Sequence, residues 1–447
     1  MNRSEILHRI REAGVVGAGG GGFPAYKKLD ANIEHVIANG VECEPLLYKD
    51  REVMIQDADK LIAGLGIVKE ITNADKVTIA IKRKNSDLKE ILSESAKKYG
   101  INIFIMENVY PAGDEYILVY DVTGKRIPPG GIPLQVGCLV ANVETLVNIA
   151  NAVSGVPVTE KYLTVSGAVK EPVTLKVPVG TSYKKCLELA GGSSVNGFSI
   201  LTGGVMMGGV TTDLSLSISK TISGLIVLPN DHSLVLRKTE PPEVYNKIGH
   251  SACDQCTFCT QLCPRYILGY PIQPHLVMRS LQMSGDEKER LSYWAQACCE
   301  CNICTLFACP EKLDPKNICA DTKKKLKEGK KGFSKSELEV VFTDIHPMRS
   351  GREIPISVLY QRLGIKKYDR KAHFVNQDKM ISEVKIKLNN HFGENGVPCV
   401  KVGDTVSKGQ LIGKVNEEAL GTPFHSSIDG QVKEIVNNSV IISSNIS

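Results

Sequence analysis

The sequence predicts a multidomain α/β plus α+β protein, with an N-terminal α/β domain, a β-grasp-like domain, a helical cysteine-rich domain and a C-terminal barrel-sandwich β domain. Three observations support this fold class. The chain has 447 residues, too many for one hydrophobic core. Its first third alternates β-rich with helical runs, and its last part consists of short strands separated by glycine turns. Nine of the 14 cysteines fall within residues 253–309.

The composition excludes several classes of function. A hydrophobic fraction of 42% with 23% charged residues is ordinary for a globular protein, and the net charge of +5 is small. No basic stripe with interleaved aromatic residues indicates nucleic-acid binding. No stretch approaches the roughly 18 apolar residues of a membrane span, and the N-terminus lacks the apolar core of a secretion signal. We therefore expect a cytoplasmic protein whose cysteines are reduced.

The first half of the chain predicts two domains. Residues 1–155 contain the strand-like runs HVIANGV, KVTIAIKR and INIFIME, with helical sequence such as 86–98 between them. Residues 156–235 carry the runs KYLTVSG, VTLKVPVG and SGLIVLP and a helix near 182–190, which is typical of a mixed β-grasp domain.

The second half predicts a cysteine-rich domain over 240–330, a linker over 331–379 and a β sandwich over 380–447. The sandwich sequence consists of two half-motifs like those of lipoyl and biotinyl carriers, which display a modified lysine on a hairpin tip. The corresponding stretch here, Phe424-His425-Ser426-Ser427, has no lysine. We therefore expect a structural or docking module instead of a swinging arm.

The first cysteine motif has the spacing C-x2-C-x2-C-x3-C-P and begins at Cys253. Two-residue gaps let a loop wrap three thiolates around an iron–sulfur cube, and in two-cluster ferredoxins the fourth cysteine ligates the other cube. A zinc site is the alternative, although zinc more often uses two separated cysteine pairs.

The second motif begins at Cys298 and has one extra residue before its last cysteine. A slightly wider loop can absorb that residue, so the sequence predicts two [4Fe–4S] clusters with exchanged fourth ligands. One cluster is expected on Cys253, Cys256, Cys259 and Cys309, and the other on Cys298, Cys301, Cys304 and Cys263. Cys299 breaks the spacing and is expected to be a spare. The isolated cysteines are expected to be small buried residues: Cys43, Cys138, Cys186, Cys319 and Cys399.

A glycine-rich stretch, Gly17-Ala18-Gly19-Gly20-Gly21-Gly22-Phe23-Pro24, contains the pattern G-x-G-x-x-G. The dinucleotide-binding fingerprint requires a preceding strand, and here an amphipathic helix precedes the glycines. By itself the stretch therefore favours a structural loop.

Four segments, the first of which contains this loop, occur along the chain in the order found in a known family. They are Gly17–Lys28, Asn39–Glu52, Tyr110–Glu115 and Val140–Leu146. This series resembles the FMN- and NADH-binding flavoprotein subunit of respiratory complex I and its relative, the RnfC family. Residues 160–230 resemble the SLBB module of that family. Val41, Asp114 and Ala141 depart from the complex I pattern and are closer to the RnfC branch.

The resemblance implies FMN and NADH as ligands. In the family the glycine loop cradles the flavin phosphate, the acidic segment and an Asn/Thr pair hold the flavin, and the Gly-x-Glu segment faces the nicotinamide nucleotide. By position it implicates Gly17, Gly19, Gly22, Lys28, Asn39, Glu42, Glu115, Asn142 and Thr145. The placement of the sandwich at the C-terminus resembles that in the cobalamin reductases of propanediol-utilisation microcompartments, which we favour, and that in RnfC-like proteins serving amino-acid reductases.

The implied activity is NADH oxidation with delivery of single electrons through FMN and two clusters to an acceptor. In the cobalamin reductase case the acceptor is a cobalamin, with an adenosyltransferase and microcompartment shell proteins as expected partners. No catalytic acid–base pair or nucleophile is evident. Two alternatives remain open: an RnfC-like carrier serving an amino-acid reductase, and a flavin-free relay between partner proteins. A purely structural role for the clusters is a third reading.

Overall fold

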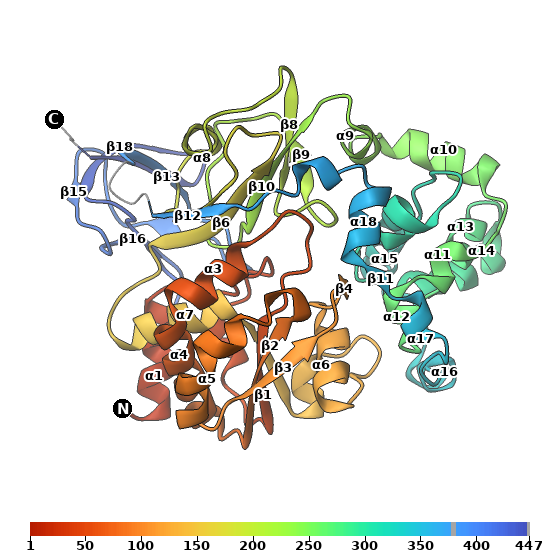
Figure 1. Cartoon of the computed structure of the whole chain (residues 1–447), viewed down its shortest axis with the longest axis horizontal. Coiled ribbons are helices and arrows are strands. Elements are labelled where there is room, and N and C mark those ends of the chain that lie inside the picture. The colour runs from red at the N-terminus through yellow and green to blue at the C-terminus, as the bar shows by residue number, and fades with distance from the viewer. Residues whose placement is uncertain (377–380, 445–447) are drawn as a thin grey trace.

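The computed structural model describes residues 1–376 and 381–444. The N-terminal domain lies below the β-grasp domain, with the cysteine-rich helices on one side and the C-terminal sandwich on the other (Figure 1). The last residues of the predicted linker, 377–379, and residues 380 and 445–447 of the predicted sandwich lie outside the described part of the chain.

The N-terminal domain is built on a parallel four-stranded sheet in the order β3-β2-β1-β5. Its strands are β1 (His35–Gly40), β2 (Lys76–Lys82), β3 (Asn102–Met106) and β5 (Cys138–Asn142). One face is covered by α1 (Arg3–Glu12), α3 (Lys49–Gln56), α4 (Ala58–Thr72), α5 (Leu88–Lys98) and α7 (Val143–Val153). The other face packs against α6 (Glu115–Thr123). Coverage of both faces explains the almost continuous apolar runs that marked these strands in the sequence.

The β-grasp domain is a six-stranded sheet in the order β12-β7-β6-β10-β8-β9. Its strands are β6 (Glu160–Gly167), β7 (Val173–Pro178), β8 (Phe198–Thr202), β9 (Gly209–Thr211), β10 (Gly224–Pro229) and β12 (His373–Asn376). The helix predicted near 182–190 is α8 (Tyr183–Leu189). Between β8 and β9 the chain turns at Gly203 and Gly204, both with positive φ, so these glycines serve a turn.

The cysteine-rich domain is helical and contacts the second face of the parallel sheet. Its helices are α10 (Pro242–Ala252), α11 (Phe258–Gln261), α12 (Pro264–Ile267), α13 (Pro274–Ser280), α14 (Gly285–Ser292) and α15 (Pro315–Glu328). Tyr270 and Met278 share one hydrophobic core with Ile37 and Val140 of the sheet. The cysteine-rich domain is therefore fixed against the sheet by apolar packing.

The segment expected as a linker carries secondary structure. It contains α16 (Lys335–Val341), α17 (Arg349–Arg352), β11 (Ile354–Pro355), α18 (Ile356–Arg362) and then β12. Strand β11 pairs with β4 (Val109–Tyr110), and β12 extends the β-grasp sheet beside β7. Leu359 and Tyr360 of α18 are buried in the β-grasp core, and the His346 N–H donates to the Ile267 carbonyl of the cysteine-rich domain at 2.9 Å, so this segment ties three domains together.

The C-terminal sandwich consists of two small sheets, β13-β19-β18-β15 and β14-β16-β17. The strands are β13 (Glu383–Lys387), β14 (Val397–Pro398), β15 (Thr405–Val406), β16 (Leu411–Lys414), β17 (Phe424–His425), β18 (Gly430–Val436) and β19 (Ser439–Ser443). Their inner faces enclose a core around Phe424. The predicted fold class is confirmed in all four of its parts.

Candidate functional site

Two cavities in the cysteine-rich domain are each lined by four of the predicted ligands. The first, here named the outer cavity, is lined by Cys253, Cys256, Cys259 and Cys309. The second, the inner cavity, is lined by Cys263, Cys298, Cys301 and Cys304. Each cavity takes three thiols from one motif and the fourth from the other, which matches the exchange expected from the spacing.

The two motifs wrap their cavities with the same backbone conformation. Gln255 and Thr257 flank the second cysteine of the first motif and have φ of 60° and 68°. Glu300 and Asn302 occupy the same offsets in the second motif, with φ of 58° and 68°. Positive φ is uncommon for residues other than glycine and persists where the surroundings demand it. The repeated pattern indicates that both loops are shaped to enclose the same kind of group.

The extra residue of the second motif is absorbed in a π-helical turn, Cys304–Ala308. Its closing bond runs from the Cys309 N–H to the Cys304 carbonyl, 3.1 Å away. A π turn accommodates one residue more than an α turn, and such turns are frequent at functional sites. The longer gap therefore leaves Cys309 able to reach the outer cavity.

The eight thiols surround cavities instead of converging on a point. Among residues 1–376 and 381–444, no three or more His, Cys, Asp or Glu side chains are arranged to hold a single metal ion. Four thiols at each cavity are the number of ligands that one [4Fe–4S] cluster takes.

The inner cavity is enclosed by contacts to two neighbouring domains. The Tyr110 hydroxyl donates to the Cys301 carbonyl at 2.8 Å, and the Asn302 amide donates to the Met206 carbonyl at 3.0 Å. Cys299 also lines this cavity as a fifth thiol.

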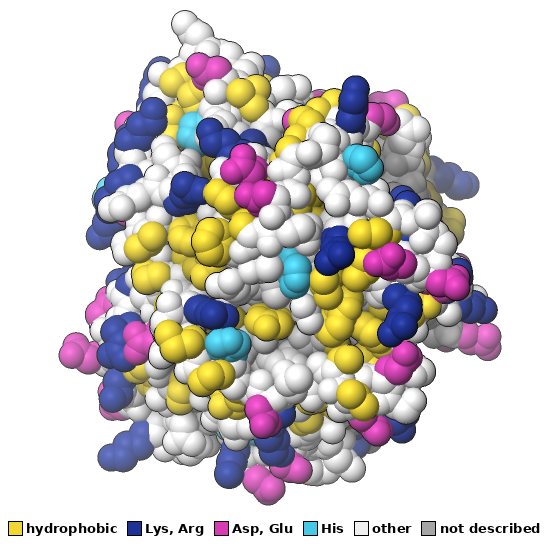
Figure 2. Space-filling model, turned by 90° about the vertical axis from the view of Figure 1, so that its right-hand side faces the viewer, with side chains coloured by type: hydrophobic (Ala, Val, Ile, Leu, Met, Phe, Trp, Pro, Cys, Tyr) yellow, Lys and Arg dark blue, Asp and Glu magenta, His cyan; other side chains and the backbone are white. Residues whose placement is uncertain are grey.

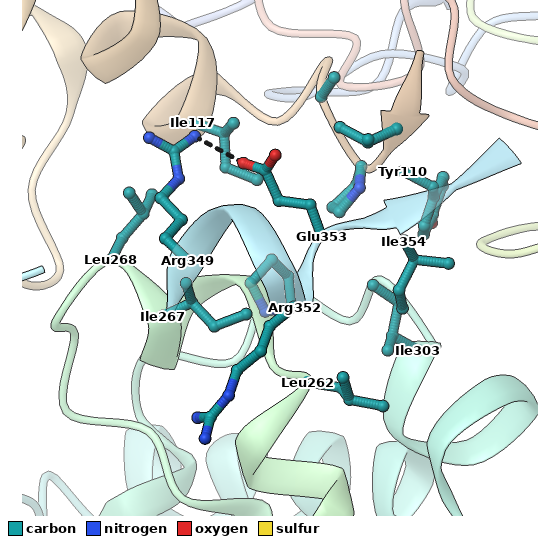
Figure 3. A pocket seen from close by; sticks show the side chains of 14 residues that line it. Tyr110, Ile117, Leu262, Ile267, Leu268, Ile303, Arg349, Arg352, Glu353 and Ile354 are labelled. Atoms are coloured by element: carbon teal, nitrogen blue, oxygen red, sulfur yellow. Dashed lines mark ion pairs between the residues drawn. The ribbon is translucent and has the colours of Figure 1, made fainter. Parts of the chain in front are cut away.

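A third, mostly apolar cavity lies on the seam between the cysteine-rich and N-terminal domains (Figure 3). Pro264 and Ile303 line both this cavity and the inner one. On its rim Arg349 pairs with Glu353 at 3.2 Å. Apolar side chains thus separate the inner cavity from the N-terminal domain.

The outer cavity lies closer to the surface. Cys253 and Cys256 are partly exposed, and the neighbouring Phe258 is 47% exposed. Helix α10 exposes Val244 and Ile248 on the same domain. The face of the molecule formed by the cysteine-rich domain displays groups of hydrophobic side chains among scattered charges (Figure 2).

The glycine stretch forms a closed loop above the parallel sheet. The Gly17 N–H donates to the Phe23 carbonyl at 2.9 Å, and the Gly22 N–H donates to the Gly17 carbonyl at 3.1 Å. A Cβ added at Gly20 or Gly21 would meet no atom within 4 Å, so the loop presents bare backbone to open space. Such a surface lets a phosphate-bearing ligand approach the main-chain amides closely. Helix α1 precedes the loop, as expected from the sequence.

The loop sits where the order of the sheet strands reverses, between β1 and β5. Ligands of open α/β sheets bind outside the carboxyl ends of the strands at such a switch point. Asn39 and Asn142 lie at those ends. The Ala18 N–H donates to Thr145 Oγ1 at 2.9 Å, and Gly19 packs against Asn142. Three of the four segments singled out in the sequence therefore meet at one place.

The fourth segment reaches the same region through side chains. Lys28 Nζ lies 3.0 Å from Glu115 Oε1, and Asn39 Nδ2 donates to the Gly113 carbonyl at 3.0 Å. Glu42 lies just beyond β1, where burial and the neighbouring Asp50 carboxylate raise its pKa to about 7. All nine residues implicated by the resemblance thus lie around the glycine loop and the adjoining strand ends.

A buried charge network beneath the loop was not identified from the sequence. Lys49 contacts Asp50 at 2.7 Å and Glu144 at 3.1 Å, and Lys161 pairs with Glu144. Lys161 Nζ also donates to the Ala18 carbonyl at 3.2 Å. Burial lowers the pKa of Lys161 to about 8, and Glu144 opposes that shift. Lys161 belongs to the β-grasp domain, so no local pattern could have linked it to the glycines.

The hairpin that corresponds to the lysine-bearing tip of a carrier domain is enclosed. Phe424, Ser426 and Ser427 have no exposed surface, and Ser427 Oγ donates to the Val179 carbonyl at 2.6 Å. These contacts support the expected structural or docking module. Cys399 of the sandwich is exposed, so the prediction of a buried residue was wrong there. None of the helices in the described part of the chain has the length and apolar character to span a membrane.

Family models match the chain in four places. They are the Nuo51 FMN-binding domain over residues 10–151, the SLBB domain over 162–209, the 4Fe-4S dicluster domain over 252–314 and the RnfC barrel sandwich hybrid domain over 362–447. These matches identify FMN and two [4Fe–4S] clusters as the cofactors.

Curated cobalamin reductases match over nearly the whole chain, and another curated relative matches over part of it. The cobalamin reductase PduS of Salmonella typhimurium is 37% identical over 99% of this chain and 97% of that protein. The cobalamin reductase PduS of Citrobacter freundii is 38% identical over 98% of this chain and 96% of that protein. A component of the proton-translocating ferredoxin:NAD(+) oxidoreductase complex of Clostridium ljungdahlii is 33% identical over 60% of this chain and 57% of that protein. Among solved structures, the NAD+-reducing [NiFe]-hydrogenase in its H2-reduced state is 20% identical, with a TM-score of 0.49 over 76% of this chain and 63% of that one.

Proposed function

The chain belongs to the family of the PduS cobalamin reductases, and on that premise we propose that it oxidises NADH and delivers electrons singly to a cobalamin. Bound FMN would accept a two-electron hydride and release its electrons one at a time to the clusters. The observation that carries the proposal is that the parallel sheet bearing the glycine-loop site shares one hydrophobic core with cysteines of both cavities, among them Cys263 and Cys309.

The proposed flavin site is the glycine loop at the strand switch point. The bare amides around Gly20 and Gly21 suit a phosphate group, and Lys28 lies on the helix that directly follows the loop. The strand ends supply polar groups for the ring system. The residues assigned to FMN and the nicotinamide nucleotide are Gly17, Gly19, Gly22, Lys28, Asn39, Glu42, Glu115, Asn142 and Thr145.

The proposed order of electron transfer follows from the surroundings of the two cavities. The inner cavity is joined to the N-terminal domain through Tyr110, whereas the outer cavity has partly exposed cysteines. We assign the inner cluster to Cys263, Cys298, Cys301 and Cys304 and the outer cluster to Cys253, Cys256, Cys259 and Cys309. The inner cluster would receive electrons from the flavin, and the outer cluster would pass them to the acceptor.

The proposed partners follow from family membership. NADH is the electron donor, and the acceptor is a cobalamin, either free or held by an adenosyltransferase. The exposed apolar side chains on the domain that holds the outer cavity, Val244, Ile248 and Phe258, support docking of such a partner. The proposed location is the cytoplasm, inside a bacterial microcompartment, with shell proteins as neighbours.

An anaerobic titration tests the proposal. Protein loaded with FMN, iron and sulfide is titrated with NADH while visible absorbance and EPR are recorded. We expect bleaching of the flavin absorbance, then cluster signals, and then reduction of added hydroxocobalamin. Clusters that dithionite reduces but NADH does not would contradict the proposal and favour the flavin-free relay. Reduction of the clusters by NADH without reduction of cobalamin would contradict only the choice of acceptor.

A further inference from the structure

The two cysteine loops have matching backbones but differ in chemistry at one position. Gln255 and Glu300 each stand directly before the second cysteine of their motif, with φ of 60° and 58°. Gln255 lines the outer cavity, and Glu300 lines the inner one. An amide can donate a hydrogen bond, whereas an ionised carboxylate can only accept one. At this position, therefore, the outer loop has a donor and the inner loop has a negative charge.

The Gln255 amide contacts a cluster ligand directly. Its Nε2 atom donates to Cys253 Sγ at 3.2 Å. A cysteine that binds iron does so as a thiolate, which has no proton and can only accept. The amide nitrogen is therefore the atom that suits this contact once the cluster is bound. Because the contact joins two residues of one loop, the loop that binds the cluster also fixes the donor.

Hydrogen bonds on both sides hold Gln255 in this conformation. The Cys256 N–H donates to Asp254 Oδ1 at 3.3 Å, and Gln261 Nε2 donates to Thr257 Oγ1 at 2.8 Å. Gln255 is half-buried, and its positive φ is uncommon for a residue other than glycine. The surroundings thus place the amide next to the sulfur before any electron arrives.

Glu300 has different contacts in the inner loop. Its carboxylate lies 3.9 Å from Lys316 Nζ and 3.7 Å from Lys323 Nζ, and its side chain is 43% exposed. Lys316 lines the inner cavity as well. The charge of Glu300 is therefore opposed by two lysines and screened by water, so its effect on the inner cluster should be small.

Other polar side chains also line the outer cavity, namely Asp254, His275 and Glu311. Asp254 and Glu311 are exposed, so water screens their charges. In the described part of the chain, none of these three side chains donates a hydrogen bond to a cysteine sulfur, whereas the Gln255 amide does. Reduction adds negative charge to a cluster and its thiolates, and a hydrogen bond to a thiolate becomes stronger as that charge grows.

We propose that Gln255 is a positioning residue that raises the reduction potential of the outer cluster through its hydrogen bond to Cys253. This contact favours transfer of an electron from the inner to the outer cluster. The direction of transfer rests on the proposed function, whereas the effect on the potential does not. Gln255 binds no iron and contacts no substrate in this role.

The test is a redox titration of full-length protein loaded with FMN and clusters, using dithionite and mediators with EPR detection. The outer-cluster signal is the one that C309S lacks. Q255L is expected to lower the equilibrium constant for reduction of the outer cluster about tenfold, equal to ~59 mV for one electron. Q255E should lower it further, because it replaces the donor with a negative charge. Q255K supplies an N–H donor again and should return the potential at least to the wild-type value.

E300Q provides the matched control, because Glu300 occupies the same offset in the second motif. The potential of the outer cluster should stay unchanged in E300Q, and the potential of the inner cluster should stay unchanged in all three Gln255 variants. Equal outer-cluster potentials in the wild type and Q255E would overturn the inference. Loss of outer-cluster iron from Q255L, Q255E and Q255K alike would also overturn it, because Gln255 would then act in cluster assembly. Failure of the proposed function would look different, because NADH would then not reduce the clusters of the wild type.

Discussion

The cysteine cavities and the glycine-loop site are assembled in different ways. All eight thiols come from residues 253–309, on two loops with the same backbone conformation. The glycine-loop site instead gathers Ala18, Asn142, Lys161 and Phe392, which lie far apart in the sequence. The first site depends on local spacing, and the second depends on how three domains pack.

This difference has consequences for mutations. A cysteine substitution should remove one cofactor and leave the domain arrangement intact, because the helices around the cavities also share an apolar core with the parallel sheet. A substitution in the network beneath the glycine loop should reduce both folding stability and cofactor binding, since the same charges serve both.

The largest expected effect is loss of a whole cluster in C263S or C309S. Each variant should retain half of the iron, because each removes one of four ligands from one cavity. C309S should lose the outer cluster although it lies in the second motif, and C263S should lose the inner cluster. Iron analysis and EPR of dithionite-reduced protein measure both outcomes.

The matched variants are C253S and C298S, which remove a first-motif and a second-motif ligand. The EPR spectrum of C309S should match that of C253S, and the spectrum of C263S should match that of C298S. The opposite pairing would show that each motif keeps its own four ligands. C399S should retain all of its iron, because Cys399 is exposed and remote from both cavities.

The next effect is on stability in E144Q. Glu144 is 2% exposed, accepts from the Tyr162 N–H at 3.0 Å and faces Lys49 and Lys161. Removing its charge leaves two buried ammonium groups with Asp50 as their carboxylate partner. This should lower the free energy of unfolding by ~3–5 kcal/mol. Denaturant unfolding measures this loss, and flavin content should fall in the same variant.

The control is D87N, which removes the charge partner of Arg51 in an exposed pair 2.6 Å apart. D87N should lower the free energy of unfolding by no more than ~1 kcal/mol.

The difference in the free energy of unfolding between the wild type and E144Q should also depend on pH. The ammonium groups of Lys161 and Lys49 outweigh burial and hold the pKa of Glu144 below its usual 4.5. The stabilisation is therefore present above that value and is lost as the pH falls through the folded-state pKa. A stability difference that grows toward acid pH would contradict this account.

The same contrast explains what the sequence could and could not predict. The fold class and the two cavities follow from patterns within short windows, such as apolar strand runs and cysteine spacing. Lys161 and Phe392 could not be found in this way, because each contacts the glycine loop from another domain. The segment 331–376 looked like a linker, since β11 has two residues and β12 four, too short for a periodic pattern. Cys399 was expected to be buried because cysteine usually is, yet it lies at the rim of a small sheet.

The smallest predicted effect concerns the bond that joins the two sites. Y110F removes the hydroxyl that donates to the Cys301 carbonyl. This should lower the free energy of unfolding by ~1 kcal/mol, while the iron and flavin contents stay unchanged. Y245F is the matched control, because it removes a similar hydroxyl bond, to Asp321, within the cysteine-rich domain. Stopped-flow reduction of the clusters by NADH should slow in Y110F and not in Y245F, since the Tyr110 hydroxyl bonds an inner-cavity loop to the N-terminal domain, whereas the Tyr245 hydroxyl bonds within the cysteine-rich domain. Equal rates in both variants would mean that the other contacts between the two domains, such as the Arg265–Asp114 ion pair and the shared apolar core, set the spacing between the two sites.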